Sequence, residues 1–152
     1  MPKQSAGILL YRYLSNQLQV FLVHPGGPFF KNKDAGAWSI PKGEFLDDEE
    51  PLPAAKREFL EETGQLVDGL FIKLSPVKLK SGKMVHAWAV EGDIDHNTVT
   101  SNVFEIEWPP RSGKMATFPE VDRAAWFDVD EALVKVNAAQ VKLIEELSLI
   151  LS

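Results

Sequence analysis

The chain has no cysteine among its 152 residues. This absence excludes disulfide bonds, thiolate zinc sites and a cysteine nucleophile together. Long hydrophobic runs are also lacking, because no apolar stretch approaches the roughly 18 residues that a membrane-spanning helix needs. The start, Met1 to Ser5, leads into an alternating segment rather than a signal peptide. We therefore expect a cytoplasmic protein with no membrane partner.

Positive charge is scarce as well. Lysine and arginine number 16 against 22 aspartate and glutamate residues, which gives a formal net charge of −6. Binding to long nucleic acids without regard to sequence depends on basic patches that displace counterions, so we expect no nucleic acid polymer as a partner. A small anionic substrate agrees with this charge if a bound metal ion inverts the local sign.

The remaining composition is that of a globular domain, with 45% hydrophobic and 25% charged residues. The length suits one domain over residues 1–152, and the alternation of strand-like and helical patterns predicts an α/β fold. We expect strands at 5–13, 19–24, 71–79, 85–91, 103–108 and 124–127, and long loops at 24–37 and 109–119. We expect helices from Asp47 or Asp48 to Gly64, from Asp128 onward, and from about residue 138.

The most informative segment runs from Gly43 to Gly64. Within it, Glu58, Glu61 and Glu62 are spaced i, i+3 and i+4, which places their carboxylates on one face of a helix. Like charges at these spacings repel one another, whereas a divalent cation that takes oxygen ligands would hold them together. The spacing therefore predicts a divalent metal site.

This segment resembles the signature of the Nudix hydrolases, which is Gly, five residues, Glu, seven residues, then Arg-Glu-apolar-any-Glu-Glu-any-Gly-apolar. The chain departs from it only at Gln65, where the family usually has an aliphatic residue. The resemblance implies the family's α/β/α sandwich, a mixed sheet between helices, and a hydrolase that depends on Mg²⁺ or Mn²⁺. The matching residues are Gly43, Glu49, Arg57, Glu58, Phe59, Glu61, Glu62 and Gly64.

The resemblance also implies roles for these residues. Glu58 and Glu62 would be the principal metal ligands, Glu61 would assist them, and the carbonyl of Gly43 would complete a site. In some members the glutamate at the Glu58 position is also the base. Arg57 lies four residues before Glu61 and can orient that carboxylate by a bidentate contact, or alternatively the carboxylate of Glu49.

Members of the family often carry one more acidic ligand or base outside this segment, shortly before a strand that begins with an aromatic residue. Glu120 fits this place because it lies six residues before Trp126. We expect Glu120 to be both a metal ligand and a catalytic group. Asp122 and either Glu105 or Glu107 remain the alternatives.

The residues from Trp38 to Gly43 resemble the segment that leads into the signature in asymmetric dinucleoside tetraphosphate hydrolases and in some nucleoside triphosphate pyrophosphohydrolases. This resemblance favours Trp38 and Lys42 as substrate contacts and a dinucleoside polyphosphate, such as diadenosine tetraphosphate, as substrate. An ordinary or oxidised nucleoside triphosphate is the alternative. A Nudix module that binds nucleotides without turnover is an alternative of another class.

The two long loops carry further candidates for contacts with the substrate. The sequence assigns no role to the three histidines and leaves the oligomeric state open. Basic side chains that can steer a polyphosphate are Lys31, Lys33, Arg111 and Lys114, and aromatic side chains that can stack on a base are Phe29, Phe30 and Phe118.

Overall fold

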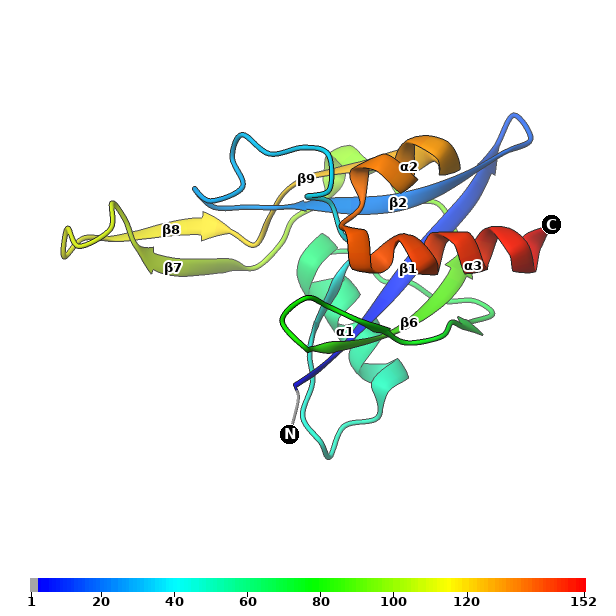
Figure 1. Ribbon diagram of the computed structural model, residues 1–152, viewed down its shortest axis with the longest axis horizontal. Helices are drawn as coiled ribbons and strands as arrows, with labels where there is room; N and C mark the ends of the chain where they lie inside the picture. The colour runs from blue at the N-terminus through cyan, green and yellow to red at the C-terminus, as the bar shows by residue number, and fades with distance from the viewer. Residues whose placement is uncertain (1–2) are drawn as a thin grey trace.

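The computed structural model describes residues 3–152. Met1 and Pro2, the first residues of the segment in which we expect no signal peptide, lie outside the described residues. The chain forms a seven-stranded mixed sheet with helices on both faces (Figure 1), which confirms the predicted α/β architecture. Within residues 3–152, no helix has the length and apolar character to cross a membrane. The strands are β1 (Gln4–Leu14), β2 (Gln17–Pro25), β3 (Lys42–Glu44), β4 (Ile72–Lys73), β5 (Val77–Lys78), β6 (Met84–Glu91), β7 (Val103–Glu107), β8 (Met115–Pro119) and β9 (Val121–Asp128). The helices are α1 (Pro51–Thr63), α2 (Val129–Lys135) and α3 (Val141–Leu151), with short 3-10 turns at His96–Thr98 and Ala138–Gln140.

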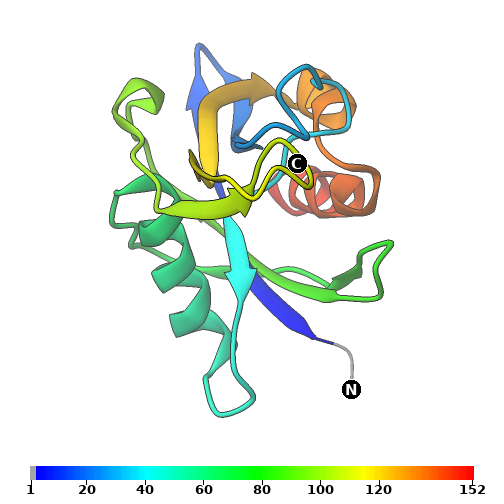
Figure 2. The same ribbon diagram turned by 90° about the vertical axis from the view of Figure 1, so that its left-hand side faces the viewer.

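The central strands of the large sheet run in the order β4-β6-β1-β2-β9, with β3 paired to β1 and β5 to β6. Strand β1 pairs parallel with β6 and antiparallel with β2. Because both faces of β1 are covered, its buried residues form a nearly continuous run from 5 to 11. Figure 2 shows α1 on one face of the sheet and α2 and α3 on the other.

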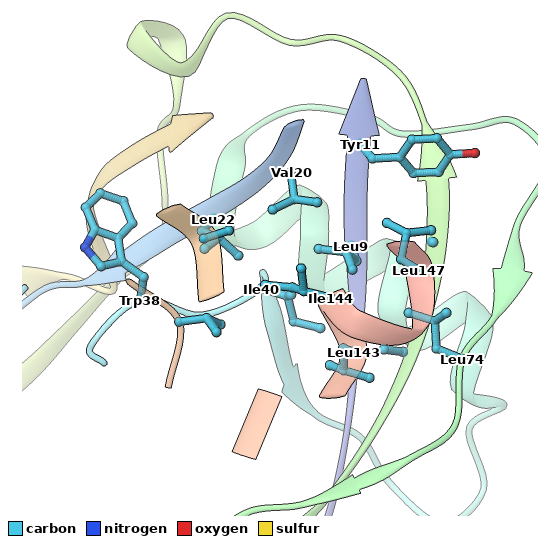
Figure 3. Close-up of a cluster of buried hydrophobic side chains, with 14 of the residues drawn as sticks. Leu9, Tyr11, Val20, Leu22, Trp38, Ile40, Leu74, Leu143, Ile144 and Leu147 are labelled. Atoms are coloured by element: carbon cyan, nitrogen blue, oxygen red, sulfur yellow. The ribbon is translucent and has the colours of Figure 1, made fainter. Parts of the chain in front are cut away.

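The two faces of the sheet carry separate hydrophobic clusters. On one face, Leu143 and Leu147 of α3 pack with Leu9 and Leu22 (Figure 3). On the other, Phe59 of α1 is fully buried in a cluster with residues of β1 and β2. Burial of Phe59 fixes the rotation of α1 about its axis, and this rotation determines where the glutamates on the same helix point.

Residues 39–44 fill the gap that opens where β1 and β2 diverge. Ser39 and Val23 exchange backbone hydrogen bonds of 2.9 and 2.8 Å, and the N–H of Ile8 donates to the carbonyl of Pro41 at 3.1 Å. The chain then continues as β3, in which Gly43 pairs with Ala6 of β1. This insertion brings the start of the acidic segment alongside α1.

Several sequence-based expectations need correction. Helix α1 starts after Glu50, whose backbone is extended, and not after Asp47 or Asp48, because Pro51 occupies the first helical turn. Gly64 ends the helix in the left-handed conformation, with φ 74°, as predicted. The expected strand at 71–79 is interrupted and forms the short β4 and β5, and the expected loop at 109–119 contains β8. Strand β3 was not expected, because pairing with a distant strand leaves no local pattern.

Candidate metal centre and substrate pocket

The three glutamates of α1 gather as their spacing predicts. Glu58 has an exposed fraction of only 8%, whereas Glu61 and Glu62 are half-buried. Arg57 Nη1 lies 3.1 Å from Glu58 Oε1 and 3.5 Å from Glu61 Oε1. Its Nη2 lies 3.1 Å from Glu49 Oε2. One guanidinium therefore contacts both of the carboxylates considered for it from the sequence, and Glu58 in addition.

Strand β3 approaches α1 very closely at Gly43. A Cβ atom at this position would lie 1.9 Å from Glu58 Oε2, which is far below any tolerated contact. The neighbouring Lys42 donates its backbone N–H to Glu62 Oε1 at 3.3 Å. The glycine of the signature thus allows the backbone of β3 to lie against the two carboxylates that the sequence assigns to the metal.

Glu120 joins this group from the beginning of β9. It lines a cavity of about 130 Å³ together with Glu62 and Lys42. The other carboxylates considered in place of Glu120, which are Asp122, Glu105 and Glu107, lie elsewhere. Asp122 is hydrogen-bonded to His24, and Glu105 is exposed on the β7–β8 hairpin. Glu107, on the same hairpin, accepts a hydrogen bond from the backbone of Arg111 (2.9 Å).

The carboxylates are electrostatically crowded. Burial raises the pKa of Glu62 to about 8, although the Lys42 ammonium opposes the shift. Burial and the charge of Glu61 raise the pKa of Glu58 to about 7. The carboxylate of Glu120 adds to both increases. Burial lowers the pKa of Lys42. Near neutral pH, Glu58 and Glu62 therefore retain protons that a bound cation would displace.

The donor atoms suit a hard divalent cation. Glu58, Glu62 and Glu120 offer carboxylate oxygens, which Mg²⁺ and Mn²⁺ prefer. Across residues 3–152, no group of three or more histidine or acidic side chains lies close enough to hold a metal ion by itself. Mg²⁺ commonly binds one or two carboxylates and completes its coordination with water and substrate phosphates. The open arrangement therefore fits a cation that is completed by its substrate.

A larger cavity of about 560 Å³ adjoins the small one, because both are lined by Pro25, Ser39 and Lys42. Its other lining residues come from three distant segments and include Phe30, Lys80 and Asn137. The aromatic Phe30 is among the side chains that the sequence suggested for stacking. Lys80 and Asn137 were not predicted, because they carry no motif and become neighbours only through the fold.

Trp38 does not lie in either cavity. It is buried, with an exposed fraction of 4%, and its Nε1–H donates to Asp34 Oδ1 at 2.8 Å. Its ring packs edge-on against His24 and Phe127. The structure therefore does not bring Trp38 to these two cavities, because its indole is used for packing against His24 and Phe127.

Arg111 and Lys114 are also placed away from the carboxylates. They lie in the turn at the end of the β7–β8 hairpin, which projects from the body of the molecule (Figure 1). The backbone N–H of Trp108 donates to the carbonyl of Lys114 at 2.9 Å, which closes the turn. The structure does not bring these two cations to the site. Phe29 packs against Trp108, and Phe118 against Phe104.

Comparison with known proteins places these features in a family. The NUDIX domain model matches residues 1–147, whereas no curated protein sequence matches the chain. Ap4A hydrolase from C. elegans, in a binary complex, shows 20% identity and a TM-score of 0.69, with 98% of this chain and 97% of that chain covered. The NUDIX domain of NrtR from Shewanella oneidensis, complexed with ADP ribose, shows 18% identity and a TM-score of 0.69, with coverage of 100% and 90%. A MutT structure from work on Aliivibrio salmonicida and Vibrio cholerae shows 14% identity and a TM-score of 0.57, with coverage of 95% and 93%.

The raised pKa of Glu62 predicts how stability depends on pH without metal. The folded pKa of about 8 lies above the ordinary glutamate value of 4.5, so the folded chain binds more protons between these two values and stability falls as pH rises through them. Glu62→Gln should remove this loss and raise the melting temperature at pH 8 by about 2–4 °C, roughly 1 kcal/mol for a chain of this length. Thermal melts in chelator at pH 6 and 8 test this.

The control for these melts is Glu145→Gln, which removes an exposed carboxylate of α3 and should leave the pH dependence unchanged. A Glu62→Gln variant that melts below wild type at pH 8 would contradict the prediction.

Gly43→Ala tests the close approach of β3 to α1. The added methyl group would meet Glu58 Oε2, so the carboxylate must move, and Mn²⁺ affinity should fall by at least about 10-fold, the scale of a disturbed ligand support. Gly92→Ala is the control, because its methyl group meets the flexible end of Leu10 at 3.1 Å. Unchanged Mn²⁺ binding by Gly43→Ala, measured by calorimetry, would show that this contact does not position Glu58.

Proposed function

The chain belongs to the NUDIX domain family, and we propose that it is a metal-dependent hydrolase of phosphoanhydride bonds in nucleotides. The observation that carries this proposal is the meeting of Glu62, Glu120 and Lys42 around one small cavity, with Glu58 beside them. A binding module without turnover would not need this crowded set of carboxylates, whose repulsion and burial oppose their ionisation.

The residues of the site have distinct tasks in this reaction. Glu58 and Glu62, supported by Glu61, Glu120 and the Gly43 carbonyl, would hold Mg²⁺ or Mn²⁺. Bound cations of this kind acidify water for attack on phosphorus and offset charge on the leaving phosphate. A carboxylate of the same group accepts the proton. Arg57 orients Glu58 and also contacts the neighbouring carboxylates of Glu49 and Glu61.

The larger cavity suits the nucleoside part of the substrate. Phe30 offers a ring on which a base can stack, and Lys42 and Lys80 supply positive charge for phosphates. Asn137 offers an amide that can both donate to and accept from a base edge. Lys42 lines both cavities, so a phosphate chain that passes it would join the nucleoside pocket to the carboxylates.

We propose a dinucleoside polyphosphate such as diadenosine tetraphosphate as the preferred substrate. The C. elegans Ap4A hydrolase, which is similar in fold, and the Trp38-to-Gly43 resemblance support this choice. The competing substrate is an ordinary or oxidised nucleoside triphosphate, for which the same metal-binding helix would serve unchanged.

The substrate prediction is tested by kcat/KM values under one Mg²⁺ condition for diadenosine tetraphosphate, nucleoside triphosphates, oxidised triphosphates and ADP-ribose. Diadenosine tetraphosphate should exceed any triphosphate, and labelled water should mark only one of its two products. Glu62→Gln should lower the rate by at least about 100-fold on every substrate. A triphosphate preference of about tenfold, equivalent to roughly 1.4 kcal/mol, would overturn the substrate but leave the hydrolase.

The Glu120 assignment predicts a separate kinetic result. Glu120→Gln should lower kcat by at least about 10-fold and change KM by less than about threefold, because a base or peripheral ligand acts mainly in the transition state. Asp122→Asn is the matched control, two residues away and pointing to His24 instead. A silent Glu120→Gln together with a damaging Asp122→Asn would show that Asp122 is the functional carboxylate.

A further inference from the structure

His24 is fully buried and uses both nitrogens of its ring. Its Nε2 donates to the backbone carbonyl of Lys33 at 2.7 Å, since a carbonyl can only accept. Its Nδ1 lies within hydrogen-bond distance of Asp122 Oδ1, also at 2.7 Å. Trp38 covers the ring edge-on, with 5.2 Å between ring centroids. A buried side chain with two short hydrogen bonds in opposite directions holds both of its partners in fixed positions.

The carboxylate partner of His24 sits at an irregularity in the sheet. His24 pairs with Arg123 in β9, but the next residue of β2, Pro25, pairs with Val121. Asp122 is therefore an extra residue without a partner in β2, and the strand is bulged at this point. A bulge changes the direction of the side chains that precede it and is frequent beside active sites.

Glu120 lies directly before this bulge and is tied to the same part of β2. Its carbonyl accepts a hydrogen bond from the backbone N–H of Gly26 at 2.9 Å. A Cβ atom on Gly26 would lie 1.9 Å from the carbonyl oxygen of Pro119. The bulge thus presses the backbone around Glu120 against β2, while the Glu120 side chain reaches the cavity that it shares with Glu62.

We propose that His24 and Asp122 are positioning residues: their hydrogen bond holds the β9 bulge in the geometry that directs Glu120 toward the metal-binding carboxylates. Neither His24 nor Asp122 lines either of the two cavities described above. The inference rests on the proposed function in one respect, the assignment of Glu120 to the metal site. It adds a histidine that no catalytic motif includes and gives Asp122 a role different from that of a ligand.

The test is Mn²⁺ binding, measured by calorimetry on the full chain. Asp122→Ala, which breaks the bond to His24, should weaken Mn²⁺ binding by about 5- to 10-fold. Asp122→Asn keeps a side chain that can hydrogen-bond to the ring and should stay within about twofold of wild type. In the Glu120→Gln background, Asp122→Ala should add less than a twofold effect, because it acts through Glu120.

Each alternative gives a different pattern. If Asp122 is itself a ligand, Asp122→Asn will weaken Mn²⁺ binding as much as Asp122→Ala, which overturns the proposal. If the pair merely stabilises the fold, Asp122→Ala will lower the melting temperature without changing Mn²⁺ affinity, or will change it equally in both backgrounds, and the proposal fails. Wild-type protein that does not bind Mn²⁺ would instead overturn the proposed function, and this inference with it.

His24→Ala extends the same test to the histidine. It should repeat the Asp122→Ala pattern, including the loss of effect in the Glu120→Gln background, with a larger fall in melting temperature because the ring is fully buried. If this variant does not fold, the Asp122 variants still decide the question, because Asp122 is partly exposed.

Discussion

The repulsion among half-buried and buried carboxylates is the constraint on which the site depends. Glu58 and Glu62 lie together, largely removed from water, beside Glu61 and Glu120. Burial and the neighbouring negative charges disfavour the ionised forms of Glu58 and Glu62, which raises the pKa of both. The rest of the fold must oppose this repulsion. It does so by burying Phe59 of the same helix in the hydrophobic cluster beneath it, so Glu120 stays beside the glutamates of α1 as long as α1 is packed on the sheet.

The repulsion between the carboxylates also explains why the two basic residues beside them, Arg57 and Lys42, are placed differently. Arg57 lies on the outer side and contacts Glu58, Glu61 and Glu49, whereas Lys42 is placed at the cavity, where its own burial lowers its pKa. Arginine stays charged and can orient several carboxylates at once. Lys42 only partly offsets the carboxylates, and in the proposed function the remaining negative charge would attract a divalent cation.

The sequence predicts the placement of these carboxylates well because the contacts that determine it are local. Glu58, Glu61 and Glu62 share a face through helical periodicity alone, and Gly64 ends the helix in a conformation that favours glycine. The larger cavity was not predictable in the same way, since Phe30, Lys80 and Asn137 come from segments far apart in the chain. For the same reason Trp38, chosen from a local resemblance, was placed at the substrate although its indole is used for packing.

Residues 39–44 connect the two halves of the site. Because they are inserted between β1 and β2, Ser39 and Lys42 line both cavities, and Gly43 lies against Glu58. The carboxylates are held by α1 and the sheet, whereas much of the larger cavity is lined by loop residues that can change without disturbing the carboxylates. One fold can keep a reaction while its substrate varies. In the proposed function, the reaction class would therefore follow from the carboxylates of the helix, and the substrate preference from the residues around the larger cavity.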